Sequence, residues 1–189
     1  MKKIALFASG SGTNVENIIN YFENKSDINQ YLVLVNNPNA KVIEKAEKRN
    51  IPVMIFDRNM LNSGKVAEKL KDFSPDLIVL AGFLWKFPEE LVKEYSNKVI
   101  NIHPALLPKY GGKGMYGHFV HEAVVKNKEK LTGITIHYVN ENYDEGAVIF
   151  QASTEVQPDF TPEEVAKAVQ RLEHKHFPEV IEQLLAKTN

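Results

Sequence analysis

Five short apolar segments alternate with amphipathic helical patterns over the first hundred residues, and this alternation constrains the fold more than any other feature. Strand, helix and strand at this spacing are typical of a parallel sheet with helices on both faces. We therefore expect a single α/β domain with a Rossmann-like, mostly parallel twisted sheet. The expected strands are residues 4–8, 31–35, 53–56, 76–81 and 98–102, and the expected helices are 13–22, 41–49, 64–73 and 88–95.

The second half of the chain changes character after a glycine-rich stretch at residues 111–114. In the last segment Thr161 can cap a helix and Glu164 completes a capping box. Pro178 is expected to kink or break that helix near its middle. Before it we expect a helix over residues 118–126 and two strands over 132–139 and 147–156, joined by a polar loop at 140–146.

Length and charge agree with one globular domain and disfavour several functions. The 189 residues include 23 Lys and Arg against 24 Asp and Glu, a formal net charge of −1. Domains usually have about 100–200 residues, and a protein that mainly binds phosphate backbone needs a surplus of basic residues. The longest apolar run, 77–85, has nine residues, whereas a membrane helix needs about 20. We therefore expect no nucleic-acid partner and no membrane span.

The chain contains no cysteine, which excludes disulfides, thiolate metal sites and a cysteine nucleophile within it. The amino terminus enters an apolar strand without a small-residue cleavage site, so we expect no signal peptide. Together these features favour a cytoplasmic protein.

A glycine-rich loop at residues 9–14 (Ser-Gly-Ser-Gly-Thr-Asn) follows the first expected strand and opens the first helix. Backbone N–H groups at such a helix start bind anions. The loop is not a Walker A sequence, it lacks the third glycine of the dinucleotide fingerprint, and Asn36 and Asn37 stand where an acidic residue would hold a ribose. We interpret it as a monophosphate or phosphosugar site. The alternative is a tight turn whose glycines serve packing only.

Asn101 and His103 lie where the fifth expected strand ends, and alternate residues of a strand point the same way. Ligands of open parallel sheets bind at these strand ends. Thr135 and His137 share one face of the sixth strand, and Asp144 follows in a polar loop. A carboxylate near His103 would raise the histidine pKa above about 6.5 and keep it partly protonated. The alternatives are a histidine that tethers a loop and an aspartate that only forms a turn.

Four histidines within 35 residues, namely His103, His118, His121 and His137, raise the alternative of a zinc site. Only His118 and His121 are close in sequence, and no cysteine assists them. We therefore expect no metal.

The chain resembles the folate-dependent formyltransferases, and within them the branch that formylates phosphoribosylglycinamide in purine synthesis. The matching stretches occur in the family's order and reach from Ser9 to Glu173, leaving no room for the further domains of hydrolase and tRNA-directed relatives. They are residues 9–14, 80–83 (Leu-Ala-Gly-Phe), 101–108 (Asn-Ile-His-Pro-Ala-Leu-Leu-Pro) and the pair His137 and Asp144. The resemblance implies one formyltransferase domain over 1–189, phosphate-binding in its first half (about 1–100) and catalytic and folate-binding in its second (about 101–189).

The implied reaction moves the formyl group of 10-formyltetrahydrofolate to the amine of 5′-phosphoribosylglycinamide, the third step of IMP synthesis. Asn101 and protonated His103 would stabilise the oxyanion, and Asp144 would assist proton transfer with a water positioned by Thr135. The loop 140–144 would close over the pterin. By role, the resemblance implies Asn101, His103 and Asp144 for catalysis, Gly12, Thr13, Asn14 and Glu173 for the substrate, Leu84, Trp85, Lys86, Phe87, Asn101, Asn140 and Asp144 for the folate, and Thr135 and His137 in support.

The sequence departs from the family pattern in the loop at 111–118, which is longer and richer in glycine, so either His118 or His121 takes the place of the family's loop histidine. Trp85-Lys86 stands where Met-Arg is usual in the family. The family also has a basic residue near the middle of the chain, and no position is assigned to it here because the loop at residues 58–65 is shortened. The rivals are formyltetrahydrofolate hydrolysis, formyl transfer to methionyl-tRNA and a non-catalytic phosphosugar-binding module. We expect small-molecule partners only and a monomer or homodimer.

Overall fold

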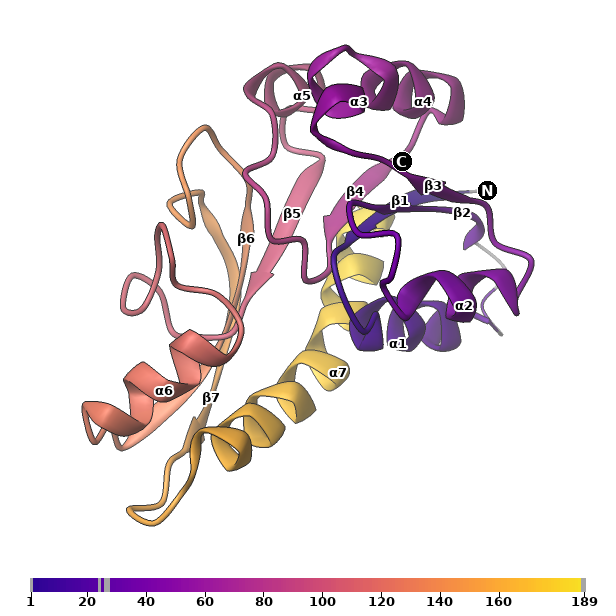
Figure 1. The fold of residues 1–189 in the computed structure, drawn as a ribbon. Helices are drawn as coiled ribbons and strands as arrows, with labels where there is room; N and C mark the ends of the chain where they lie inside the picture. The colour runs from indigo at the N-terminus through magenta and orange to yellow at the C-terminus, as the bar shows by residue number, and fades with distance from the viewer. Residues whose placement is uncertain (1, 24, 26–27, 188–189) are drawn as a thin grey trace.

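A seven-stranded sheet in the order β3-β2-β1-β4-β5-β6-β7 forms the centre of the protein (Figure 1). The computed structural model describes residues 2–187 apart from 24, 26 and 27. The pairs among β1 to β5 are parallel, β6 is antiparallel to β5, and β7 is antiparallel to β6. The α/β sheet expected from the sequence is therefore confirmed. The strands are β1 (Lys2–Ala8), β2 (Ile28–Val35), β3 (Val53–Ile55), β4 (Leu77–Leu80), β5 (Val99–His103), β6 (Leu131–Tyr138) and β7 (Val148–Glu155).

Seven helices in the described residues surround this sheet, and two of them differ from the prediction. Helix α3 was not expected; Asp57 begins it by accepting a hydrogen bond from the Met60 amide at 2.8 Å. Of the kink or break expected at Pro178, the break does not occur, because α7 runs on through this buried proline. The helices are α1 (Thr13–Phe22), α2 (Val42–Glu47), α3 (Arg58–Asn62), α4 (Lys65–Phe73), α5 (Glu89–Glu94), α6 (His118–Lys126) and α7 (Pro162–Ala186).

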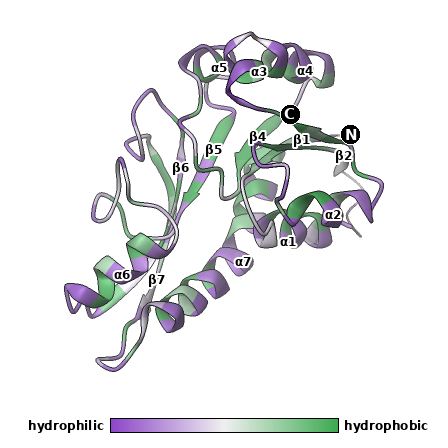
Figure 2. Cartoon of the chain, viewed as in Figure 1, coloured by the Kyte–Doolittle hydropathy of each residue, from purple (hydrophilic) through white to green (hydrophobic). Residues whose placement is uncertain are grey.

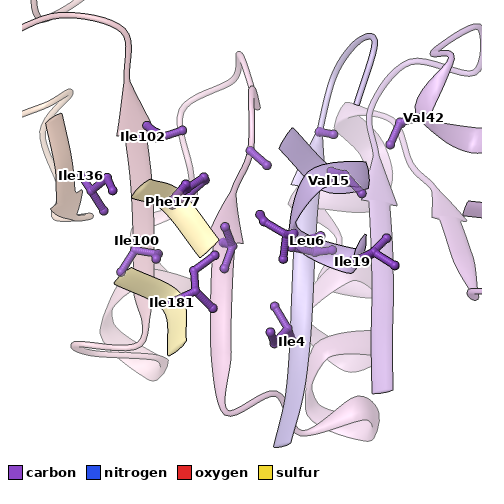
Figure 3. Close-up of a cluster of buried hydrophobic side chains, with 14 of the residues drawn as sticks. Ile4, Leu6, Val15, Ile19, Val42, Ile100, Ile102, Ile136, Phe177 and Ile181 are labelled. Atoms are coloured by element: carbon purple, nitrogen blue, oxygen red, sulfur yellow. The ribbon is translucent and has the colours of Figure 1, made fainter. Parts of the chain in front are cut away.

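Helices α1, α2 and α7 cover one face of the sheet and α3, α4 and α5 the other (Figure 1). Alternate residues of β1 serve the two layers. Leu6 lies in the same buried cluster as Val15 and Phe177 (Figure 3), whereas Phe7 belongs to the cluster on the other face. Strands buried on both faces are rich in apolar residues, as the green colour of β4 shows (Figure 2). Strand β5 is apolar except for Asn101 and His103. This explains the uninterrupted apolar segments of the sequence.

Strand register brings the polar residues at the carboxyl ends together. Leu80 of β4 is paired with Asn101 of β5, Asn101 with His137 of β6, and His103 with Thr135. Because β6 is antiparallel to β5, it starts at the edge at which β5 finishes, and its pairing places Thr135 and His137 beside His103 and Asn101. None of the helices in the described part of the chain is both long and apolar enough to span a membrane.

Candidate active site

A cavity of about 610 Å³ opens at this edge of the sheet. Its size falls within the range of about 300–1,000 Å³ that small-molecule sites occupy. Gly12, Thr13 and Thr135, also expected at the site, are not among the lining residues. The expected site residues that do line it are Asn14, Leu84, Trp85, Lys86, Phe87, Asn101, His103, His137, Asn140, Asp144 and Glu173.

His103 is held between a main-chain carbonyl and a carboxylate, and only 3% of it is exposed. Its Nε2 lies 2.7 Å from the carbonyl oxygen of Tyr110. A carbonyl oxygen only accepts, so Nε2 carries the proton and donates it. Its Nδ1 faces Oδ2 of Asp144 at 3.5 Å. The nitrogen that meets the carboxylate is therefore the one free to gain a proton.

The pKa of His103 differs from the sequence-based expectation. Burial lowers this pKa, and burial outweighs the opposite effects of the Asp144 charge and the Tyr110 carbonyl. The expected rise above the ordinary value is thus wrong, because desolvation of a charged imidazole exceeds the attraction of one carboxylate. His103 is mainly neutral at pH 7.

Asp144 stays ionised although it is largely enclosed. Burial alone would raise its pKa, but His137, the charge of His103 and the Gly112 amide together lower it. The Gly112 N–H donates to Oδ2 at 3.0 Å. This amide belongs to the glycine-rich loop, so the loop that departs from the family pattern helps to hold the carboxylate.

His137 orients Asn101 beside it. Nδ1 of His137 lies 2.9 Å from the Tyr138 carbonyl oxygen and donates to it, so Nε2 is left as an acceptor. The amide nitrogen of Asn101 lies 3.2 Å from this Nε2 and donates to it. His137 is 2% exposed, so no competing solvent reaches it freely. This bond fixes the orientation of the Asn101 side-chain amide. The second N–H of the same nitrogen remains available to another acceptor.

The loop before α1 has the backbone that an anion site needs. Gly12 is the N-cap of α1 in the left-handed region, with φ of 67°. A Cβ built on it would lie 2.3 Å from Cγ2 of Val42, so only glycine fits. No side chain caps the helix, which leaves its first N–H groups available. Thr13 accepts a bond from Gln170 of α7 at 3.3 Å, a partner that the sequence did not reveal.

Glu173 connects α7 to the start of α1. Its Oε2 accepts a hydrogen bond of 2.9 Å from the Asn14 amide, while the Asn14 Oδ1 is buried without a partner. Burial raises the pKa of Glu173, against the effect of the Asn14 bond. The side chains of Asn14 and Glu173 thus line the cavity between the anion loop and the catalytic residues.

Thr135 has a different role from the expected one of positioning a water. It is fully buried, and its hydroxyl donates to the Ala105 carbonyl at 2.7 Å. The hydroxyl also accepts from the Leu107 amide at 3.0 Å and from Gln151 at 2.8 Å. With these bonds made, Thr135 supports the loop that follows His103.

The segment 84–87 forms another wall of the cavity. The Ser9 hydroxyl accepts from the Leu84 amide at 3.0 Å and ties the segment to the end of β1. The Arg58 guanidinium lies 3.9 Å from the centre of the Trp85 ring. The unexpected helix α3 thereby brings a basic residue to this wall. Among the described residues, no group of three or more His, Asp or Glu side chains is arranged to hold a metal ion.

Comparison with known proteins decides the family. The formyl transferase family model matches residues 2–181. Phosphoribosylglycinamide formyltransferase of Bacillus subtilis (strain 168) is 37% identical over 195 residues, covering 100% of this chain and 97% of that protein. The chain belongs to the formyl transferase family. The resemblance seen in the sequence is therefore confirmed.

Other relatives of this formyl transferase agree. The chloroplastic phosphoribosylglycinamide formyltransferase of Arabidopsis thaliana is 38% identical over 187 residues, and the match spans 95% of this chain and 64% of the plant protein. The crystal structure of phosphoribosylglycinamide formyltransferase from Bacillus halodurans has a TM-score of 0.90 and 33% identity, covering 100% of this chain and 97% of that one.

The glycine-rich loop of this formyl transferase lines the cavity through residues 112–117. Of the two histidines that follow, His121 also lines it and is 7% exposed, whereas His118 is exposed and does not. Tyr110, Gly112 and Gln170 were missed in the sequence because each acts through main-chain geometry or a long-range contact.

Proposed function

We propose that the protein transfers the formyl group of 10-formyltetrahydrofolate to the amine of 5′-phosphoribosylglycinamide. The observation that carries this proposal is a single cavity that joins the anion loop, through Asn14 and Glu173, to Asn101, His103 and Asp144. The name of the full-length bacterial relative supports the choice of substrates. The enzyme would thus act in purine synthesis.

The substrates have separate parts of the cavity in this proposal. The phosphate lies on Gly12, Thr13 and Asn14 at the start of α1, where N–H groups and the helix dipole attract an anion. Glu173 contacts the remainder of the ribosylglycinamide. The folate lies along residues 84–87 and under the loop 140–144. The first half of the chain thus supplies the phosphate site and the 84–87 part of the folate site, and the second half supplies the catalytic groups and the loop 140–144.

Asn101 stabilises the negative charge that develops on the formyl oxygen. One of its two N–H groups is bound to His137, which leaves the other for the oxyanion. A donor fixed before the reaction costs no reorganisation when charge appears. His137 is thus a positioning residue for Asn101, and its Nε2 also lies 3.6 Å from Oδ1 of Asp144.

His103 and Asp144 move the proton. The amine attacks the formyl carbon and forms the new C–N bond, and its surplus proton passes to Nδ1 of His103. Asp144, at 3.5 Å, stabilises the imidazolium that results. The proton then goes to N10 of the folate as the bond from N10 to the formyl carbon breaks. Neutral His103 is the form that this sequence of steps requires at the start.

The proposal extends to the setting of the reaction. We place the enzyme in the cytoplasm, with small molecules as its substrates, as a monomer or homodimer without nucleic-acid or membrane partners. The steps above are completed by side chains and need no metal ion. The net charge of −1 agrees with substrates smaller than tRNA.

One assay tests the reaction against its rivals. The protein is incubated with 10-formyltetrahydrofolate alone, with phosphoribosylglycinamide, or with methionyl-tRNA, and release of tetrahydrofolate is followed by absorbance. Release only with the ribonucleotide is expected. Release from the folate alone would identify a hydrolase, and release only with the tRNA would identify the tRNA-directed activity. Binding of both small molecules without release would identify a binding module.

A further inference from the structure

His121 is a buried imidazole without any hydrogen bond in the part of the chain that the structure describes. It lies in α6 and is 7% exposed. Its Nδ1 is enclosed and has no partner, and no bond of Nε2 is found among the described residues. Buried polar groups are almost always paired, because an unpaired one lowers the free energy of unfolding. Because Nδ1 is enclosed, Nε2 is the nitrogen that can meet a ligand in the cavity that His121 lines.

The position of His121 shows which ligand it meets. It lines the same cavity as His103, Gln170 and Glu173. Helix α6 packs against α7, which carries Gln170 and Glu173 and leads to the anion loop. Residues 84–87, which form the proposed folate wall, pack with the layer on the opposite face of the sheet from α7. The α7 side of the cavity is the one that the proposed function gives to the ribonucleotide.

We infer that His121 is a substrate-binding residue whose imidazole hydrogen-bonds an uncharged oxygen of phosphoribosylglycinamide, between the phosphate and the reacting amine. Two kinds of oxygen offer this chemistry, the 2′- and 3′-hydroxyls of the ribose and the glycine carbonyl. The inference rests on the proposed function for the identity of the substrate.

The charge state of His121 agrees with an uncharged partner. Burial lowers its pKa, and the charges of His103 and His118 lower it further. A neutral imidazole both donates and accepts one hydrogen bond. It is therefore suited to a hydroxyl or a carbonyl, and a phosphate dianion is better served by the N–H groups of the helix start.

Replacement of His121 by leucine separates binding from structure. His121→Leu removes both nitrogens and keeps a similar volume. We expect the Kd for phosphoribosylglycinamide, measured by calorimetry, to rise about 3- to 10-fold, the effect of one lost hydrogen bond. The Kd for 10-formyltetrahydrofolate should not change. The thermal midpoint of the free protein should rise, because a buried unpaired group has been removed. His121→Gln, which keeps an amide donor, should recover part of the affinity.

His118→Leu is the matched control, since it makes the same change in the same helix on an exposed residue outside the cavity. It should leave both Kd values unchanged. An analogue that lacks both the 2′- and the 3′-hydroxyl distinguishes the two kinds of oxygen. Equal Kd values for His121→Leu and the wild type would identify a ribose hydroxyl, and a persisting difference would identify the carbonyl.

An unchanged ribonucleotide Kd in His121→Leu would overturn the inference, whether or not the folate Kd or the thermal midpoint changes. A rise in both Kd values with a lower thermal midpoint would also overturn it, because the role of His121 would then be structural. Calorimetry needs no turnover. If the wild type binds the ribonucleotide but transfers no formyl group, the proposed function fails while the test of His121 remains valid.

Discussion

His103 and Tyr110 are joined by a hydrogen bond of 2.7 Å from the imidazole Nε2 to the main-chain carbonyl oxygen. Tyr110 is in the left-handed region, with φ of 56°, and its carbonyl is thereby turned toward the histidine. The bond fixes which nitrogen holds the resting proton. Nδ1 is consequently free for the reaction, and it is the nitrogen that faces Asp144.

Loss of His103 should abolish most of the activity without unfolding the protein. Removal of an acid–base group typically costs about 10²- to 10⁴-fold in rate, and we expect kcat of His103→Ala to fall by that amount. Steady-state kinetics with both substrates measure it. His118→Ala, which changes an exposed histidine outside the cavity, is the control and should retain normal kcat. Near-normal turnover of His103→Ala would refute the proton-transfer role.

Asp144→Asn should lower the pKa of His103 further. Burial and the neighbouring His137 lower that pKa, and the Asp144 charge opposes them, so removal of the charge leaves them less opposed. The imidazole should then gain its second proton only at a lower pH than in the wild type, and kcat should fall because the imidazolium formed during the reaction loses its partner. NMR titration of the ¹⁵N-labelled histidines follows the first effect. A rise in the pKa would contradict this arrangement.

His137→Leu should disorder Asn101 while leaving the cavity intact. The variant removes the acceptor that holds the Asn101 amide at 3.2 Å. We expect kcat to fall about 3- to 10-fold, the effect of one lost hydrogen bond, with little change in either KM.

Asn101→Leu removes the proposed oxyanion donor itself, and its loss should be about 10²- to 10³-fold. If His137 acts through Asn101, the double variant should be no slower than Asn101→Leu alone. Additive losses in this cycle would show that His137 contributes independently of Asn101.

The sequence predicts those parts of the molecule that depend on local patterns. The alternation of apolar segments was sufficient for the sheet, because strands buried on both faces are mostly apolar. The two-residue period of a strand placed Asn101 beside His103 correctly. These relationships require no knowledge of the loops.

The parts that the sequence did not predict depend on long-range geometry. The partners of His103 and Asp144 are main-chain groups of Tyr110 and Gly112, and any residue type can supply a carbonyl or an amide. The direction of the His103 pKa shift results from competition between burial and charge, and burial is known only from the fold. Thr135 was placed on the correct face, but its hydroxyl bonds run to segments distant in the chain.

Gly12→Ala should weaken the anion loop more than any other single-methyl change there. The left-handed backbone costs a non-glycine residue about 1–2 kcal/mol, and the new Cβ would lie 2.3 Å from Cγ2 of Val42. We expect the free energy of unfolding, measured in urea, to fall by about 1–3 kcal/mol. The KM for the ribonucleotide should rise, because displaced N–H groups no longer converge on the phosphate.

Gly10→Ala provides the matched control two residues away. A Cβ at Gly10 meets no atom within 4 Å, and its backbone is outside the left-handed region. Its free energy of unfolding should therefore remain within about 0.5 kcal/mol of the wild type. If the two variants lose equal stability, the clash with Val42 is not the cause. If Gly12→Ala is destabilised but keeps its ribonucleotide KM, the phosphate does not lie on this loop, because a displaced loop could not hold it unchanged.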